Sequence, residues 1–131
     1  MAGNLSNYLE NKLVGHSVGV TWTPPGTTYV ALFTATPTET GGGTEVSGGS
    51  YSRKSLVAPT AWTVTGSTAT NASAITFTAA SADWGTIEAL GLFDASTAGN
   101  LLWYGPLNTP RTVTNANVFQ IDTGQLALTL E

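Results

Sequence analysis

The chain has 131 residues and a mass of 13.5 kDa, which is enough for one hydrophobic core and too little for two. It contains no cysteine, so disulfides, thiol nucleophiles and cysteine-ligated zinc are excluded. Only 9% of the residues are charged, against about 25% in ordinary soluble domains, and the net charge is −4. We therefore expect no direct nucleic-acid partner and a surface that is largely covered by copies or partners.

Neither an export signal nor a membrane span is expected. Residues 1–15 include Glu10 and Lys12 and lack a basic start followed by an apolar run. Gly, Pro, Thr and Asn interrupt every apolar stretch before it reaches the roughly 20 residues that a spanning helix needs.

A short helix is expected near the N-terminus. One apolar stripe has helical spacing and consists of Leu5, Tyr8, Leu9 and Leu13. Asn4 is the candidate N-cap, and Gly15 is the candidate stop. A helix of about ten residues is marginal alone, so its stripe should dock on its own sheet or on a neighbouring subunit.

Short β-prone runs separated by Gly, Pro, Asn and Ser follow from Val18 onward. The expected strands are residues 18–23, 28–35, 50–57, 62–65, 74–78, 86–94, 101–104, 118–122 and 125–130. Nearly continuous apolar runs at 29–33 and 89–93 predict strands covered on both faces, whereas 75–78 and 126–130 alternate. The sequence predicts a mainly β, single-domain antiparallel β-sandwich or barrel-like roll over residues 16–131, with a short N-terminal helix or arm over residues 1–15.

Two connecting segments have distinct compositions. Residues 24–26, Pro-Pro-Gly, predict a rigid turn between two strands, because proline fixes φ and restricts the residue before it. Residues 36–49 are rich in glycine and carry Glu39 and Glu45, which indicates a flexible acidic loop. This loop either reaches a partner or is a solvated loop ordered by its own packing.

The sequence offers no catalytic constellation. His16 is the single histidine, and its place after the expected helix favours an interaction with the helix dipole over catalysis. Residues 94–100 fit a hairpin turn better than a calcium loop, and residues 41–43 lack the lysine of a phosphate loop. We expect no enzyme, no cofactor and no metal site, and a small hydrolase using His16 is the formal alternative.

A few residues are candidates for an interface. Glu45 and the adjacent cations Arg53 and Lys54 are of interest because the chain has so few charges, and two neighbouring cations on a strand point to opposite faces. Arg53 beside Tyr51 can bind a carboxylate bidentately, across subunits or within one subunit. Trp84 lies at a turn before a core strand and is expected to be a core or interface anchor. Sugar stacking is the alternative for the aromatic residues as a set, which are Trp22, Trp62, Trp84, Trp103, Tyr8, Tyr29, Tyr51 and Tyr104. The expected interface residues are Leu5, Tyr8, Leu9, Leu13, Glu45, Tyr51, Arg53 and Trp84.

Several stretches carry a resemblance to known proteins over nearly the whole chain: residues 5–10, 29–34, 37–38, 45–53, 82–86, 91–94 and 99–102. In this order they resemble a family of small phage structural proteins that are often labelled tail fibre proteins. Residues 58–70 depart most from the family. The resemblance implies a component of the virion, assembled in the host cytoplasm, with no membrane partner.

The role within the virion has two interpretations. A compact β domain with few charges is similar to capsid decoration, or cement, proteins, which implies a homotrimer that binds the major capsid protein and stabilises the assembled shell by mass action. Apolar strand faces would then form the trimer, and the helix or loop 36–49 would contact the shell. The alternative is a tail fibre or baseplate module that contacts tail or baseplate proteins and attaches to the host through exposed aromatic residues.

Overall fold

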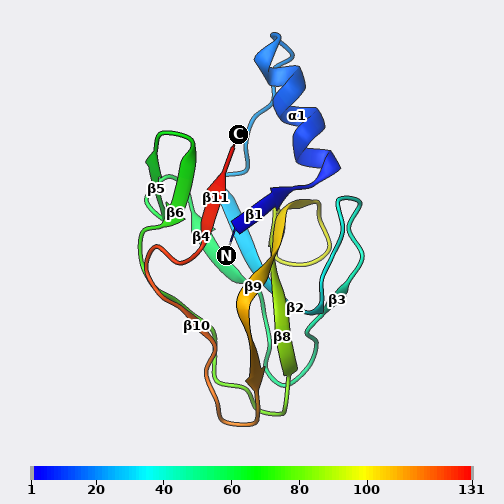
Figure 1. Ribbon diagram of the computed structural model, residues 1–131, viewed down its shortest axis with the longest axis vertical. Helices are drawn as coiled ribbons and strands as arrows, with labels where there is room; N and C mark the ends of the chain where they lie inside the picture. Colours follow the sequence, from blue (N-terminus) through cyan, green and yellow to red (C-terminus); the bar gives the residue numbers. More distant parts are fainter. Residues whose placement is uncertain (1, 131) are drawn as a thin grey trace.

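The computed structural model of the chain describes residues 2–130 (Figure 1). Met1, the first residue of the expected N-terminal helix or arm, and Glu131, the last residue of the expected β domain, lie outside the described residues. The elements in chain order are β1 (Ala2–Leu5), α1 (Asn7–Ser17), β2 (Thr27–Ala35), β3 (Thr44–Glu45), β4 (Lys54–Val57), β5 (Trp62–Thr65), β6 (Thr68–Asn71), β7 (Ile75–Thr76), β8 (Gly85–Phe93), β9 (Leu101–Val113), β10 (Gln120–Ile121) and β11 (Ala127–Thr129). The prediction of a mainly β chain with one short N-terminal helix is confirmed.

Nine strands form one sheet, and its path runs β3-β2-β8-β9-β1-β11-β6-β5, with β4 paired to β2 beside it. The strands β7 and β10 form a separate antiparallel pair. Strand β1 is antiparallel to β9 but parallel to β11, so the large sheet is mixed. Because the path ends at β3 and β5 among the described strands, the sheet is open and not a closed barrel.

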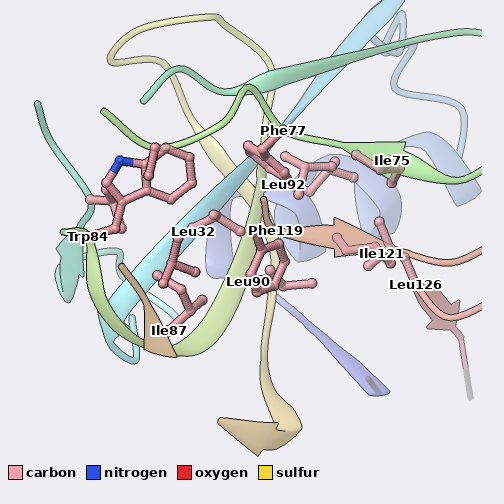
Figure 2. Packing of buried hydrophobic residues seen from close by; sticks show 14 of the residues in the cluster. Leu32, Ile75, Phe77, Trp84, Ile87, Leu90, Leu92, Phe119, Ile121 and Leu126 are labelled. Atoms are coloured by element: carbon pink, nitrogen blue, oxygen red, sulfur yellow. The ribbon is translucent and has the colours of Figure 1, made fainter. Parts of the chain in front are cut away.

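The main core lies between the central strands of the large sheet and the small sheet (Figure 2). Figure 2 shows side chains from both sheets in one cluster, which includes Leu32, Ile75, Phe77, Ile87, Leu90, Leu92, Phe119 and Ile121. Phe77 and Phe119 meet edge to face, with ring centroids 5.8 Å apart. Alternating burial at residues 75–78 confirms that Ile75 and Phe77 face the core while their neighbours face solvent.

The strands β2 and β8 are covered on both faces, as their apolar runs predict. On the face opposite the main core, Ala31, Phe33 and Ala89 form a second buried cluster with Phe93 packed against it. A Cβ atom at Gly91 would lie 2.7 Å from a ring carbon of Phe33, so this part of the sheet has no room for a side chain there. Close packing on both faces fixes the register of these two strands.

The helix begins later than the sequence predicts, because Ser6 rather than Asn4 is its N-cap. Ser6 has an extended backbone, and its Oγ accepts a hydrogen bond from the N–H of Leu9 over 3.2 Å. The N–H of Ser6 donates to the carbonyl of Leu102 over 2.9 Å, which ties this end of the helix to β9. At the other end, α1 continues past Gly15 to Ser17. Leu5 therefore belongs to β1 and not to the helix.

The expected strand at residues 18–23 is wrong. Residues 18–26 have no regular secondary structure and form a linker, whose side chains are exposed or half-buried. The N–H groups of Val18, Gly19 and Val20 bond to carbonyls at the end of α1, so these groups are not available to a neighbouring strand. The turn expected at residues 24–26 therefore leads from this linker, not from a strand, into β2.

Three short strands lie outside the predicted ones, and one predicted strand is much longer. Strands β1, β3 and β6 were not expected, and β9 continues to Val113 where the sequence predicts an end at Tyr104. The expected strand at 50–57 forms only from Lys54, and that at 118–122 forms only over β10. Strand β1 forms by pairing with the distant strands β9 and β11. Strand β3 pairs with β2, β6 pairs with β5 and β11, and the extension of β9 pairs with β8. In each case strand pairing decides the conformation and local β-propensity does not.

Candidate interaction surfaces

Three of the predicted interface residues form one hydrogen-bonded group inside the chain. Arg53 donates from Nε to Oε1 of Glu45 and from Nη2 to Oε2, each over 2.8 Å. The hydroxyl of Tyr51 donates to Oε1 of Glu45 over 2.8 Å and accepts from the N–H of Leu32 over 3.0 Å. The bidentate contact that was expected across subunits or within one is therefore made within one subunit.

Arg53 also closes the loop between β8 and β9. Its Nη1 donates to the carbonyl oxygens of Ala95 over 2.9 Å and Ala98 over 2.8 Å. Its guanidinium carbon lies 3.7 Å from the ring centroid of Phe93, and its side chain is only 7% exposed. The hairpin turn expected at residues 94–100 is thus confirmed, and the cation that its carbonyls bind is the chain's own arginine.

The charges of this group stabilise one another. Burial acts to raise the pKa of Glu45, but hydrogen bonds from Arg53 and Tyr51 and the positive charge of Arg53 outweigh it and hold this pKa below its ordinary value. Burial raises the pKa of the Tyr51 phenol, and the Glu45 carboxylate raises it further. Near neutral pH the group therefore holds an ionised acid, an ionised arginine and a neutral tyrosine.

Trp84 packs inside the chain next to this group. Its side chain is 6% exposed, and its Nε1 donates to the carbonyl of Gly49 over 2.9 Å. Its ring meets that of Tyr51 edge to face, with centroids 5.5 Å apart. Gly49 has a φ of 58°, and a Cβ there would lie 2.8 Å from Nε1 of Trp84, so the tight contact requires glycine. Of the two anchoring roles expected for Trp84, the structure gives it the core one.

The helical stripe docks partly on the sheet of its own chain. Leu9 is buried, whereas Tyr8 and Leu13 are half-buried, and Leu5 is half-buried in β1. Leu9 and Leu13 line an apolar groove of about 390 Å³. The other large side chains that line it are Trp22, Trp62, Leu92, Leu102, Trp103, Leu128 and Leu130. Trp22, Trp62 and Trp103 are among the aromatic side chains for which sugar stacking is the alternative role, and the structure places all three at this groove.

A second, more polar cavity of about 510 Å³ lies beside the first turn of α1. Its lining includes Tyr8, the glycines at 41–43, and the rings of Phe33 and Phe93. The N–H of Asn7 donates to the carbonyl of Glu39 over 3.0 Å, so the acidic loop at 36–49 is held against the helix by a backbone hydrogen bond.

Neither a metal cluster nor a membrane span occurs in the part of the chain that the structure describes. No three His, Cys, Asp or Glu side chains within residues 2–130 lie close enough together to hold a metal ion. No helix over the same residues has the length and apolarity needed to cross a membrane. His16 is exposed in the last turn of α1, and its Nδ1 accepts from the N–H of Trp22 over 3.4 Å.

A comparison with protein families shows to which family the chain belongs. A family described as podophage GP4 fiber I protein gp80 matches residues 4–129. The chain belongs to this family. The match runs from within β1 to the end of β11, so the gp80 fibre family covers nearly the whole sheet, and the resemblance to phage tail fibre proteins is confirmed. Membership indicates a phage structural protein and a component of the virion. No curated protein matches the chain.

Proposed function

We propose that this chain is a non-enzymatic structural subunit of a phage fibre, carried on the virion. The observation that supports this role most strongly is the match of the gp80 fibre family to residues 4–129. The function would consist of static contacts with copies of the chain and with tail or baseplate proteins, without turnover or a cofactor. Through these contacts the fibre would present a surface to the host.

Several features of the fold suit a subunit that works by contact. The group formed by Glu45, Tyr51 and Arg53 orders the fold from within, in a chain that has few other charges. Within the described part of the chain, seven large apolar side chains are exposed, namely Val14, Val18, Val20, Val57, Val64, Val118 and Leu130. Exposed apolar surface favours association, and we expect a homotrimer.

A second candidate is capsid decoration, in which the chain would bind the major capsid protein on the assembled shell. The observation in its favour is the shape of the chain: the described residues form one domain whose strands pack around a common core. Such a module can sit on a shell as readily as on a tail. The fibre role takes precedence because the family match supports it.

Immunogold electron microscopy of intact parent virions separates the two candidates. Antibody raised against the purified chain should label the tail region, and antibody preabsorbed with the same chain is the matched control. Label spread evenly over the capsid would favour decoration and contradict the fibre role. Virions that carry no label, and no peptide of the chain by mass spectrometry, would contradict both.

A further inference from the structure

Strand β5 leaves one edge of the large sheet open. The path of described strands ends at β5, which pairs with β6 on one side and with no strand of residues 2–130 on the other. Figure 1 shows the hairpin of β5 and β6 at the rim of the molecule. Thr63, Val64 and Thr65 are all exposed, so the open edge of β5 is accessible to another strand.

The hydrogen bonds beside β5 show which of its backbone groups face the open edge. The N–H of Ala72 donates to the carbonyl of Ala61 over 2.9 Å, so these two residues form a bonded pair of the hairpin. Bonded and non-bonded pairs alternate along an antiparallel ladder, so Trp62 and Val64 direct their backbone groups away from β6. The N–H of Trp62 donates to the carbonyl of Pro59 over 3.1 Å. The N–H and the carbonyl of Val64 therefore point out of the sheet.

The open edge of β5 lacks the features that keep exposed edges from pairing, which are charges, prolines, bulges and short length. Strand β4 begins with Lys54, and β3 has two residues beside a shift in register. The far half of β9 pairs with β8 alone among the described strands, and it contains Pro106 and Pro110. In contrast, β5 has the sequence Trp-Thr-Val-Thr, with high β-propensity and neither charge nor proline.

The distribution of charge favours a second copy of the chain as the partner at this edge. Each copy has a net charge of −4, so most approaches of two copies are opposed by repulsion. From Ser55 to Ala82, a stretch that contains β5 and β6, the chain has no charged residue. Two copies that meet at β5 therefore bring no like charges together, whereas a charged partner would find no counter-charge there.

Strand β5 is also complementary to itself. Trp62 and Val64 line the apolar groove, so Thr63 and Thr65 lie on the opposite face of the sheet. Two antiparallel copies of β5 centred on Val64 place valine opposite valine on one face, and Thr63 opposite Thr65 on the other. Apolar pairs and threonine pairs both stabilise neighbouring strands. A slip of one residue would place Val64 opposite a threonine and mix the two faces.

We propose that two copies of the chain join by antiparallel pairing of their β5 strands about a two-fold axis at Val64. The N–H of each Val64 donates to the carbonyl of the other, and the large sheet continues from one copy into the next. This contact joins copies in pairs, so it is separate from the homotrimer that we expect and independent of the place in the virion. A strand of four residues makes a small interface, so the pairing is weak in solution and is strengthened where the virion holds copies close together.

Disulfide trapping tests the pairing, because the chain has no cysteine of its own. The Cα atoms of a hydrogen-bonded antiparallel pair lie about 5.5 Å apart, which a disulfide can span. Concentrated Val64→Cys should therefore give nearly complete linkage into dimers on a non-reducing denaturing gel after oxidation. Val118→Cys is the matched control, since Val64 and Val118 are 71% and 53% exposed, and it should stay mostly unlinked. Linkage equal to that of the control, or linkage that leaves the third chain of each trimer free, would overturn the proposal.

A mixture of two variants tests the register. In the proposed pairing Thr63 and Thr65 of the two copies are opposite each other as a non-bonded pair, about 4.5 Å apart. Thr63→Cys mixed with Thr65→Cys should therefore form a disulfide between one chain of each kind. Either variant alone should form few disulfides, because its own copies are diagonal across the pair at about 7–8 Å. Equal linkage alone and in the mixture would contradict the register and, with it, the two-fold axis at Val64.

A charge at the centre of the edge tests the same contact without cysteine. Val64→Lys places two ammonium groups opposite each other at an exposed position, so it should weaken the pairing and not the fold. The concentration at which pairs dissociate should rise about tenfold in analytical ultracentrifugation, with Val118→Lys at the wild-type value. An unchanged dissociation concentration, or a wild-type chain that is monomeric at millimolar concentration, would overturn the proposal. Each of these results leaves the fibre role untouched.

Discussion

Replacing Arg53 by methionine should lower the free energy of unfolding by about 3 kcal/mol, because a buried pair that loses one partner costs roughly 3–5 kcal/mol and a surface pair roughly 0–1 kcal/mol. The side chains of Arg53 and Glu45 are 7% and 26% exposed, which places this pair near the lower end of the buried range. Methionine retains an unbranched apolar stem, so the loss is mainly electrostatic. The substitution removes two hydrogen bonds from Arg53 to Glu45 and two from Arg53 to the carbonyls of the loop between β8 and β9.

Urea unfolding followed by tryptophan fluorescence measures this loss. With a slope of roughly 1.5 kcal/mol per molar urea for a chain of this size, the midpoint should fall by about 2 M. Lys54→Met is the matched control on the neighbouring residue, which is half-buried, and should change the free energy by less than about 0.5 kcal/mol.

A double-mutant cycle with Glu45→Gln isolates the pair. The loss in Arg53→Met/Glu45→Gln should be smaller than the sum of the two single losses by about 1–2 kcal/mol, because the pair is coupled. The reasoning is refuted if Arg53→Met unfolds within about 0.5 kcal/mol of the wild type, or if the two substitutions are additive.

Three further predictions concern acid stability, the core and one glycine. The pKa of Glu45 in the folded chain is below its ordinary 4.5, so the ionised carboxylate stabilises the fold fully above pH 4.5, and this stabilisation is lost as pH falls through the folded pKa. Between pH 5 and 3 the wild type should therefore lose more stability to urea than Glu45→Gln, and equal losses would contradict this. Ile87 is 0% exposed, so Ile87→Ala should cost about 3 kcal/mol in the same unfolding assay, while Val14→Ala on the exposed helix face should cost less than about 1 kcal/mol. A Cβ at Gly43 would lie 2.5 Å from the carbonyl oxygen that ends β2, whereas a Cβ at Gly42 meets no atom within 4 Å. Both glycines have positive φ, so Gly43→Ala should be the more destabilising by about 2 kcal/mol in thermal unfolding, and a smaller effect at Gly43 than at Gly42 would argue against the clash.

The parts of the fold that follow from sequence are those in which local pattern and burial agree. The apolar runs at 29–33 and 89–93 became β2 and β8, which the two clusters cover on both faces. In the alternating stretch at 126–130, Leu126 and Leu128 are buried as expected, but Leu130 is 43% exposed because it lies beyond the end of β11.

Strand β1 could not be predicted because its sequence, Ala-Gly-Asn-Leu, has no β pattern. It forms a strand because β9 and β11, about a hundred residues later, supply both of its edges. The same geometry places residues 2–5 within the large sheet, so the N-terminal stretch expected as a helix or arm contributes to the β domain itself.

The candidate interface residues could be named from the sequence, but the partner of each could not. Scarcity of charge drew attention to Glu45 and Arg53, and the structure brings them together with Tyr51. Sequence alone could not say whether their contact joins two subunits, because an intramolecular pair needs the same residues. The groove beside Trp62 and Trp103 needed the fold, since its walls come from segments that are far apart in the chain.

An asymmetric cryo-EM reconstruction of the parent virion, with this chain traced into density, tests the central claim most directly. The account predicts copies of the chain in a fibre on the tail. Density for the chain over the icosahedral shell, with none at the tail, would contradict the fibre role.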